Sequence, residues 1–320
     1  MKNLSCHLFG EFSSSERYYF FGWFVVSVFF MTLTLLFNVL LLLTFCFKLT
    51  YRDLRLKLIM LLSCVDLVQG LTTYPISTAI LYKRSQGLTE CFMIAENEVL
   101  AHCLVFATIV IICVIAAEQY FYIVHPFLHD RYISGKSLCI PSLVISAAIF
   151  TVNIMKPFVN LFWRTIFEGI SIGACALIFL LTIFFYLSMW WTWRRVQKQI
   201  TDQNKEEGLR ISQQAKASKT SFLVLLAFVI CYMPRISLMG YDIVVGVTRW
   251  IGIYVEWPTA LMAFAKSWLN PVIYFWRLAV VRSTIKKTLD GILSKLHVVS
   301  GEKPPNHEQL QRRVTIQSVV

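Results

Sequence analysis

Charged residues are scarce in this chain: Asp, Glu, Lys and Arg make up 15% of its 320 residues, and apolar residues make up 57%. Soluble domains carry about 25% charged residues, so the composition excludes an ordinary soluble protein. Runs of about 20 apolar residues match the hydrocarbon core of a bilayer. Seven such runs predict an all-α integral membrane protein with seven transmembrane helices, at roughly 19–47, 58–81, 99–117 (in a helix of about 92–125), 138–158, 169–193, 220–241 and 250–276.

Acidic residues are also few, 18 against 30 Lys and Arg, which leaves a net charge of +12. A nucleic-acid partner is one explanation, and the distribution of the charge argues against it. With the C-terminus inside, the inner segments hold 21 of the 30 basic residues and the outer segments 8, whereas the acidic residues divide equally. This is the positive-inside bias of membrane proteins. It predicts a multi-pass plasma-membrane protein with its N-terminus outside, its C-terminus inside and no nucleic-acid partner.

The sequence lacks the common marks of membrane enzymes, transporters and channels. It contains no HExxH and no Cys/His cluster with metal-ligand spacing, which argues against an enzyme and against a metal site. It has no internal repeat, and two charges, Asp66 and Lys266, lie deep in the spans. Transporters more often show repeats and several buried charges. The spans are apolar nearly all round, unlike the walls of a pore.

Outer cysteines are scarce. Of nine cysteines, Cys6 and Cys91 are the two predicted on the outer, oxidising side. A Cys6–Cys91 disulfide is therefore the outer pairing available, and the sequence leaves its formation open. Asn3-Leu4-Ser5 is an N-glycosylation sequon on the same side, and its occupancy also stays open.

Pro234 and Pro271 each stand inside the apolar run of a predicted span. A proline within a helix removes one backbone hydrogen bond. In a bilayer the freed carbonyl still needs a partner, which a neighbouring Asn or an adjacent helix can supply. The two prolines therefore predict hinges surrounded by polar groups.

Three motifs carry a resemblance to a known family. Asn270-Pro271-Val272-Ile273-Tyr274 resembles the NPxxY motif in the seventh helix of rhodopsin-like (class A) G-protein-coupled receptors. Glu118-Gln119-Tyr120, with Pro126 after it, is similar to the motif that ends helix 3, and Cys231-Tyr232-Met233-Pro234 is similar to CWxP of helix 6. The resemblance covers about 18–295. It implies a seven-helix bundle with a short amphipathic eighth helix that carries an extracellular ligand signal to a heterotrimeric G protein.

The resemblance also implies a buried polar core, made by Asn38, Asp66, Thr108, Lys266 and Asn270. Lys266 lies four residues before Asn270, on the face that relatives turn toward Asp66. Pairing is the usual reason that an intramembrane Lys is tolerated. We therefore expect Lys266 to pair with Asp66, in place of the sodium ion that many relatives hold. The retinal lysine of opsins corresponds to Phe264, so no retinal and no other cofactor are expected.

Two departures from the family bear on signalling. Gln119 stands where the family has an arginine that pairs with its acidic neighbour, and Gln214 stands where many relatives have an acid facing that arginine. Both halves of this ion pair are missing. An alternative function is therefore a non-coupling seven-helix receptor that acts as a scavenger, a silent dimer partner or an escort.

The ligand is not identified by the sequence. Ala101 stands where aminergic receptors have the Asp that binds an amine, so a small polar, zwitterionic or peptide ligand stays open. The outer loop at about 159–168 has no Cys, and helix 5 lacks its usual Pro. These absences give a weak similarity to the melanocortin, cannabinoid, lysophospholipid and adenosine receptors. The candidate pocket residues are Glu98, Ala101, His102, Arg235, Met239 and Phe264.

Four regions follow from these expectations: an extracellular segment 1–18, the membrane domain 19–276, an amphipathic helix 277–297 and a cytoplasmic tail 298–320. Basic and apolar residues alternate in 277–297, which suits a helix on an anionic membrane surface. The inner loop 194–219 is basic and predicts a docking surface for a cytoplasmic partner such as a G protein or arrestin. The final Ser318-Val319-Val320 fits a PDZ ligand.

Overall fold

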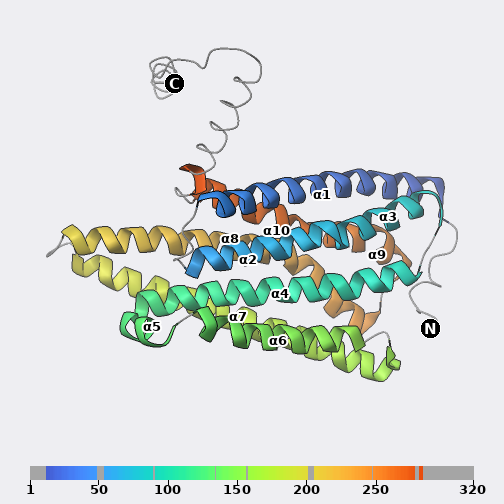
Figure 1. Ribbon diagram of the computed structural model, residues 1–320. Coiled ribbons are helices and arrows are strands. Elements are labelled where there is room, and N and C mark those ends of the chain that lie inside the picture. The colour runs from blue at the N-terminus through green and yellow to red at the C-terminus, as the bar shows by residue number, and fades with distance from the viewer. Residues whose placement is uncertain are drawn as a thin grey trace, which may run out of the picture.

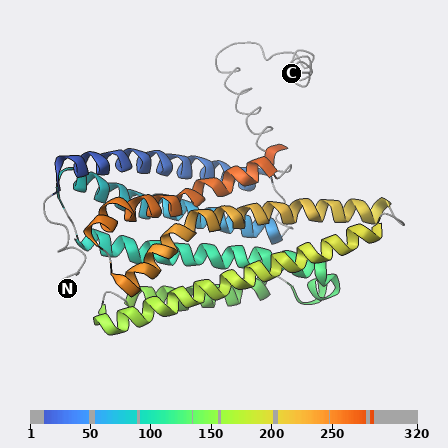
Figure 2. The same ribbon diagram turned by 180° about the vertical axis from the view of Figure 1, so that it is seen from behind.

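The computed structural model describes residues 12–48, 54–88, 91–133, 135–155, 158–200, 205–246, 248–277 and 281–283. Within these ranges all regular structure is helical. The long helices lie side by side in one bundle (Figure 1, Figure 2). Their bounds are α1 Ser14–Lys48, α2 Leu54–Leu71, α3 Thr73–Ser85, α4 Cys91–Val124, α5 Pro126–Tyr132, α6 Gly135–Met155, α7 Leu161–Ile200, α8 Lys205–Val245, α9 Arg249–Tyr254 and α10 Glu256–Arg277.

Among the described residues, the longer helices form seven segments that run along the bundle: α1, α2 with α3, α4, α6, α7, α8 and α10. Five segments are long and apolar enough to cross a membrane, at 14–45, 56–85, 99–124, 165–192 and 222–242. α6 contains a shorter apolar run, 140–155. α10 has 22 residues, a length that fits the ~30 Å hydrocarbon core, and it is more polar because it carries Lys266 and Asn270. The all-helical membrane fold predicted by hydropathy is confirmed. We call the end where α1 begins the outer end and the end where α10 stops the inner end, after the predicted orientation.

The second span is interrupted at Thr72, between α2 and α3. Pro75 explains the break, because its ring clashes with the carbonyl four residues earlier, that of Leu71, and it has no N–H to donate. Thr72 has backbone angles of φ −119° and ψ −72°. The Thr72 side chain donates to the Val68 carbonyl at 2.6 Å. The span therefore changes direction without leaving the bundle.

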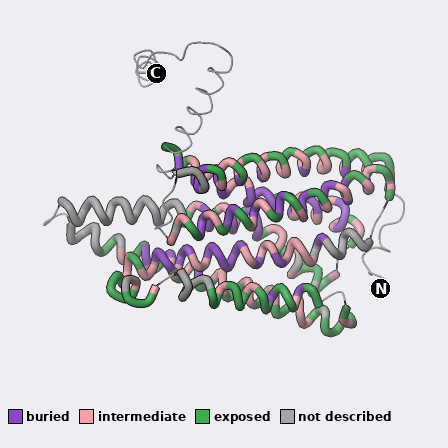
Figure 3. The backbone as a smooth tube through the Cα atoms, viewed as in Figure 1, coloured by how far each residue is buried: buried purple, intermediate pink, exposed green. Residues whose placement is uncertain are grey.

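α4 lies at the centre of the bundle and packs against α2, α3, α6, α7 and α8. Its inner half buries an unbroken apolar run from Ile109 to Ile112. Figure 3 shows buried residues along α4 and exposed residues on the outward faces of α1 and α6. Large apolar side chains on those faces, such as Phe29 and Leu143, are exposed. Helices that are apolar on their outward faces fit a lipid surrounding, where no water competes for the backbone.

Two segments predicted as loops are partly helical, although the membrane-length runs beside them, 165–192 and 222–242, end within a few residues of the predicted positions. The predicted inner loop 194–219 is largely helical, because α7 continues to Ile200 and α8 begins at Lys205. The predicted outer loop 159–168 is shorter, because α7 begins at Leu161. Hydropathy marks where a chain leaves the bilayer, and a helix continues beyond that point when its residues favour it.

The predicted last span, 250–276, is two helices rather than one. α9 ends at Tyr254 and α10 begins at Glu256. Pro258 stands four residues after Tyr254, so it cannot donate to the Tyr254 carbonyl and the helix breaks there. The amphipathic helix predicted at 277–297 and the tail 298–320 fall outside the described residues, apart from 277 and the short helical stretch 281–283.

Candidate functional site

An ion pair joins Asp66 of α2 to Lys266 of α10 in the middle of the bundle. The Lys266 Nζ lies 2.9 Å from the Asp66 Oδ1, and both side chains have 0% exposure. A single buried charge is strongly unfavourable, whereas a hydrogen-bonded pair offsets much of that penalty. The structure thus brings together the two intramembrane charges that the sequence singled out.

Three more side chains complete the hydrogen bonding of this pair. The Asn270 amide donates to Asp66 Oδ2 at 2.9 Å, and the Ser267 hydroxyl lies 3.0 Å from Asp66 Oδ1. Lys266 Nζ also donates to the Thr108 hydroxyl of α4. We call Asp66, Thr108, Lys266, Ser267 and Asn270 the polar core. It ties α2, α4 and α10 together with bonds that lie out of reach of water.

Asn38 connects α1 to the polar core. Its amide nitrogen donates to the backbone carbonyl of Ser267 at 2.8 Å, and its amide oxygen accepts from the Ser63 hydroxyl at 2.8 Å. The Ser267 carbonyl stands four residues before Pro271, so it is the group that Pro271 leaves without a helical donor. The donor for this freed carbonyl therefore comes from Asn38 on the adjacent helix α1.

Gln69 also reaches the polar core, and the sequence reasoning missed it. The Ser267 hydroxyl lies 3.0 Å from the Gln69 Oε1, and Gln69 has 0% exposure. Gln69 stands three residues after Asp66, on the same face of α2. An amide inside an apolar span was the available signal, and its spacing from the carboxylate places it on the core side.

The inner end of α4 has a histidine near Glu118. The His129 Nε2, from α5, lies 3.7 Å from the Glu118 Oε1, and the Tyr120 hydroxyl lies 3.2 Å from the His125 Nε2. Gln119 is 3% exposed. Gln119 has no charge to pair with Glu118, and a side chain of α5, His129, lies beside this carboxylate.

A cavity of about 300 Å³ lies between α4, α7, α8 and α10. Most of its wall is apolar, and aromatic side chains form its inner part. The Phe228 and Tyr232 rings of α8 stack with centroids 4.5 Å apart. Phe106, Phe179 and Phe264 face the same space. The size and the apolar wall suit a small organic ligand.

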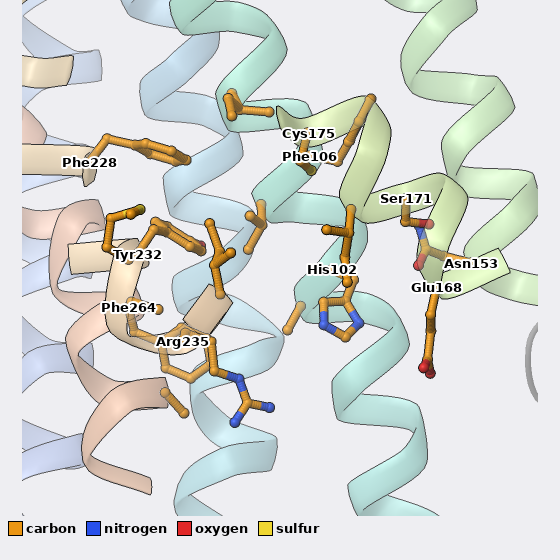
Figure 4. A pocket seen from close by; sticks show the side chains of 18 of the residues that line it. His102, Phe106, Asn153, Glu168, Ser171, Cys175, Phe228, Tyr232, Arg235 and Phe264 are labelled. Atoms are coloured by element: carbon orange, nitrogen blue, oxygen red, sulfur yellow. The ribbon is translucent and has the colours of Figure 1, made fainter. Parts of the chain in front are cut away.

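Polar groups gather at the other end of the cavity (Figure 4). The Nη1 atom of Arg235, on α8, lies 4.0 Å from the Oε1 atom of Glu256, on α10. His102 of α4 and Glu168 of α7 line the same end, and Figure 4 shows their side chains away from Phe228. On each of the four helices, the polar residue lies nearer the outer end than the aromatic residue that lines the cavity. The pairs are His102 and Phe106, Glu168 and Phe179, Arg235 and Phe228, and Glu256 and Phe264. The cavity is thus apolar at its inner part and charged at its outer part.

The predicted ligand residues are partly gathered in this cavity. Ala101, His102, Arg235 and Phe264 line it. The side chains of Glu98, Met239 and Cys91 lie outside what the structure describes, as do Asn3, Cys6 and Gln214. The sequence reasoning missed Glu168 and Glu256 as cavity residues, along with Asn97, Asn153 and Ser171.

A comparison with known protein families gives a match. The model of the family of seven-transmembrane receptors (rhodopsin family) matches residues 37–274. Among curated proteins, none matches the chain. The matched range runs from α1 to α10 and includes the polar core, the inner end of α4 and the cavity. The chain therefore belongs to the rhodopsin family of seven-transmembrane receptors, which are receptors and not enzymes.

Proposed function

We propose that this receptor carries the signal of an extracellular ligand, bound in the cavity, to a heterotrimeric G protein at the inner end. The observation that carries this proposal is that α10 contributes residues to both the cavity and the polar core. Phe264 lines the cavity, and two residues further along the same helix Lys266 holds Asp66 in the polar core. A ligand that moves the wall at Phe264 therefore acts on the helix that bears the buried ion pair.

The mechanism rests on two helices with prolines. α8 packs against α10, and each contains a proline within its length, Pro234 and Pro271. A proline weakens its helix locally and permits a bend there. A ligand that binds one bend state more tightly shifts the population toward that state by its difference in affinity. The cavity residues Phe228 and Tyr232 lie on the inner side of Pro234, so the ligand contacts the segment that moves.

The experiment is a screen of a ligand library against the natural chain in cells, read by G-protein activation. The proposal is supported by a ligand that activates the natural chain and no longer activates the variant Tyr232→Ala, in which the cavity wall lacks this aromatic ring. Binding without activation at any G-protein class contradicts it. Coupling to arrestin is read in the same cells by arrestin recruitment.

A second function, a non-coupling receptor, is favoured by one observation. Gln119 is buried at the inner end of α4, where the family has the arginine that contacts the G protein. The substitution Gln119→Arg separates the two functions. If the natural chain and the restored chain both give second-messenger output, the chain couples. If output appears only in the restored chain, the non-coupling function is correct for the natural sequence.

We propose that the receptor resides in the plasma membrane with its N-terminus outside, supported by the excess of basic residues on the inner segments. Epitope tags at the two ends test this. Staining of intact cells at the N-terminal tag alone agrees with the proposal, and staining of both tags contradicts it. Glycosidase treatment of the same protein reports whether Asn3 is glycosylated.

A further inference from the structure

Part of the cavity wall is exposed on the outside of the bundle. Among the residues that line the cavity, three are exposed: Ala176 of α7, and Met233 and Ile236 of α8. Met233 is 48% exposed and Ile236 is 38% exposed, whereas Phe228 and Tyr232 line the same cavity and are 2% and 3% exposed. Contact with the cavity by itself therefore leaves a side chain buried. The three exposed residues must also reach the outer surface of the bundle.

Buried side chains close the other sides of the cavity. Ile80 of α3 and Trp257 of α10 close the side toward α1, and Ile149 closes the side toward α6. Inward of the cavity α7 and α8 are in contact, where the rings of Tyr186 and Phe222 have centroids 5.9 Å apart. The exposed part of the wall is thus a gap between α7 and α8, bounded by the three exposed residues, and we call it the lateral opening.

The lateral opening lies at the depth of the hydrocarbon core. Ala176 stands eleven residues inward of the outer limit of the apolar segment 165–192, and Met233 stands nine residues inward of the outer limit of 222–242. At 1.5 Å per residue these positions are about 16 Å and about 14 Å inside the apolar segments, roughly half of the ~30 Å core. The lateral opening therefore faces the lipid chains and not the water on either side.

The residues around the lateral opening are apolar. Beside Ala176, Met233 and Ile236, the neighbouring residues of the cavity wall are Ile172 of α7 and Val229 of α8. None of these five side chains carries a charge, an N–H or an O–H. A charged group that passes between them loses its hydration without a partner to replace it, whereas an uncharged apolar molecule meets no such penalty. The cavity volume of about 300 Å³ is at the lower end for ligand sites and suits one small molecule rather than a lipid with two chains.

We propose that the ligand of the cavity is a small, uncharged, apolar molecule that dissolves in the bilayer and enters between α7 and α8 through the lateral opening. This inference rests on the proposed function in that it takes the cavity as the ligand site. Partition into the lipid concentrates such a molecule beside the lateral opening. Met233 lies in its path, and the unbranched methionine side chain changes rotamer readily, so the ligand passes without a movement of either helix.

The first test compares three probes that share a fluorophenylbutyl body and differ in their end group: an alcohol, a quaternary ammonium and a sulfonate. The full-length receptor is purified in nanodiscs of uncharged lipid, and the apparent Kd comes from the ligand-dependent rise of the thermal unfolding midpoint. We expect the alcohol to bind and both charged probes to bind about tenfold more weakly or less. A charged probe that binds as tightly as the alcohol overturns the inference, as does the absence of alcohol binding.

The second test concerns the route, which equilibrium binding does not report. Gly173 lies on α7 one turn outward of Ala176, does not line the cavity, and a Cβ added to it meets no atom within 4 Å. Gly173→Trp should therefore fold and place a large ring beside the lateral opening. Exchange of the alcohol probe between lipid and cavity, measured by fluorine NMR, should slow several-fold while the Kd changes little, because an obstacle on the path slows entry and exit equally.

Two further variants complete this test. Gly22→Trp on α1 is the matched control, since Gly22 is also exposed with no atom within 4 Å of an added Cβ, and it should leave the exchange rate unchanged. Met233→Ala shortens the side chain in the path and should speed the exchange. Slower exchange in Gly173→Trp or faster exchange in Met233→Ala supports the route. Exchange that is unchanged in both variants overturns it.

The failure of this inference is distinguishable from the failure of the proposed function. Probe binding and exchange in purified receptor require no G protein, so entry of the alcohol through the lateral opening without cellular signalling contradicts coupling and leaves the inference standing. Conversely, a permanently charged ligand that activates the natural chain supports the receptor function and overturns the inference.

Discussion

The side-chain amide of Asn38 donates to the backbone carbonyl of Ser267 at 2.8 Å, and this carbonyl is the one freed by Pro271. A donor on α1 thus replaces the backbone N–H that α10 lacks at this turn. The bond holds the weakened turn of α10 in place without closing it as a regular helix would. The hinge in α10 is therefore held by a side chain of α1, which can be released.

A second proline of α10, Pro258, also leaves a backbone carbonyl that accepts a hydrogen bond from a side chain of α1. Pro258 leaves the Tyr254 carbonyl without a helical donor, and the Tyr19 hydroxyl of α1 donates to it at 2.9 Å. One helix, α1, thus supplies the replacement donor at both prolines. Besides crossing the bilayer, α1 therefore stabilises α10 at its two prolines, a role that the apolar composition of α1 does not indicate.

Asn38→Leu should destabilise the receptor by about 1–2 kcal/mol, because the Ser267 carbonyl and the Ser63 hydroxyl both lose a partner inside the bundle. The measurement is thermal unfolding of the purified protein. Pro271→Ala restores the N–H of residue 271, so in that background Asn38→Leu should have a smaller effect. A double-mutant cycle without such coupling contradicts the pairing of the amide with the freed carbonyl. Tyr19→Phe serves as a milder comparison, since the Tyr19 bond is only part-buried.

Lys266→Met should destabilise the receptor strongly, by about 3–5 kcal/mol, because it leaves the Asp66 carboxylate buried without its cation. Asp66→Asn in the same chain should recover much of the loss, since an amide at this position needs no counter-ion. The expression level of correctly folded protein and its unfolding midpoint report both effects. A double variant that is less stable than Lys266→Met alone contradicts the ion-pair account.

The natural receptor should be insensitive to sodium. The Lys266 ammonium already lies 2.9 Å from Asp66, where a cation would compete with it. In Lys266→Ala the oxygens of Asp66, Thr108 and Ser267 face a vacated space, and hard cations prefer such oxygen ligands. The midpoint of Lys266→Ala should therefore rise when choline chloride is replaced by sodium chloride at constant ionic strength. A rise of the same size in the natural chain shows that the ammonium does not occupy the cation position.

His129→Gln should loosen α5 from α4, because it removes the partner that lies 3.7 Å from Glu118. The pair is partly exposed, so the effect on global stability should be small, within about 1 kcal/mol. Hydrogen exchange of the backbone of Pro126–Tyr132 should rise several-fold as the local opening becomes easier. His102→Gln, in the outer half of α4, is the matched control and should leave this exchange unchanged. Equal exchange in natural chain and His129→Gln means that Glu118 does not hold α5.

Most of the fold could be predicted because bilayer thickness sets the length of each apolar run. The boundaries could not be predicted with the same rule. At 194–219 the chain is polar and basic and still helical on both sides of residues 201–204, because helix propensity does not require apolar residues. Near Tyr254 the hydropathy rule fails in the opposite direction, because an apolar run predicted as one helix is divided into two. Pro258 causes the division through its missing backbone N–H, which hydropathy does not measure.

The sequence by itself determined the seven membrane-length segments, the prolines that weaken α8 and α10, and the need for Asp66 and Lys266 to find a partner, since each follows from composition and spacing along one chain. Only the tertiary structure decided which donors serve the freed carbonyls and which charges share the cavity. Glu168, Arg235 and Glu256 lie on three different helices. Their meeting depends on how each helix is rotated about its axis when the bundle packs, and that rotation is set by the fit of many side chains rather than by any one of them.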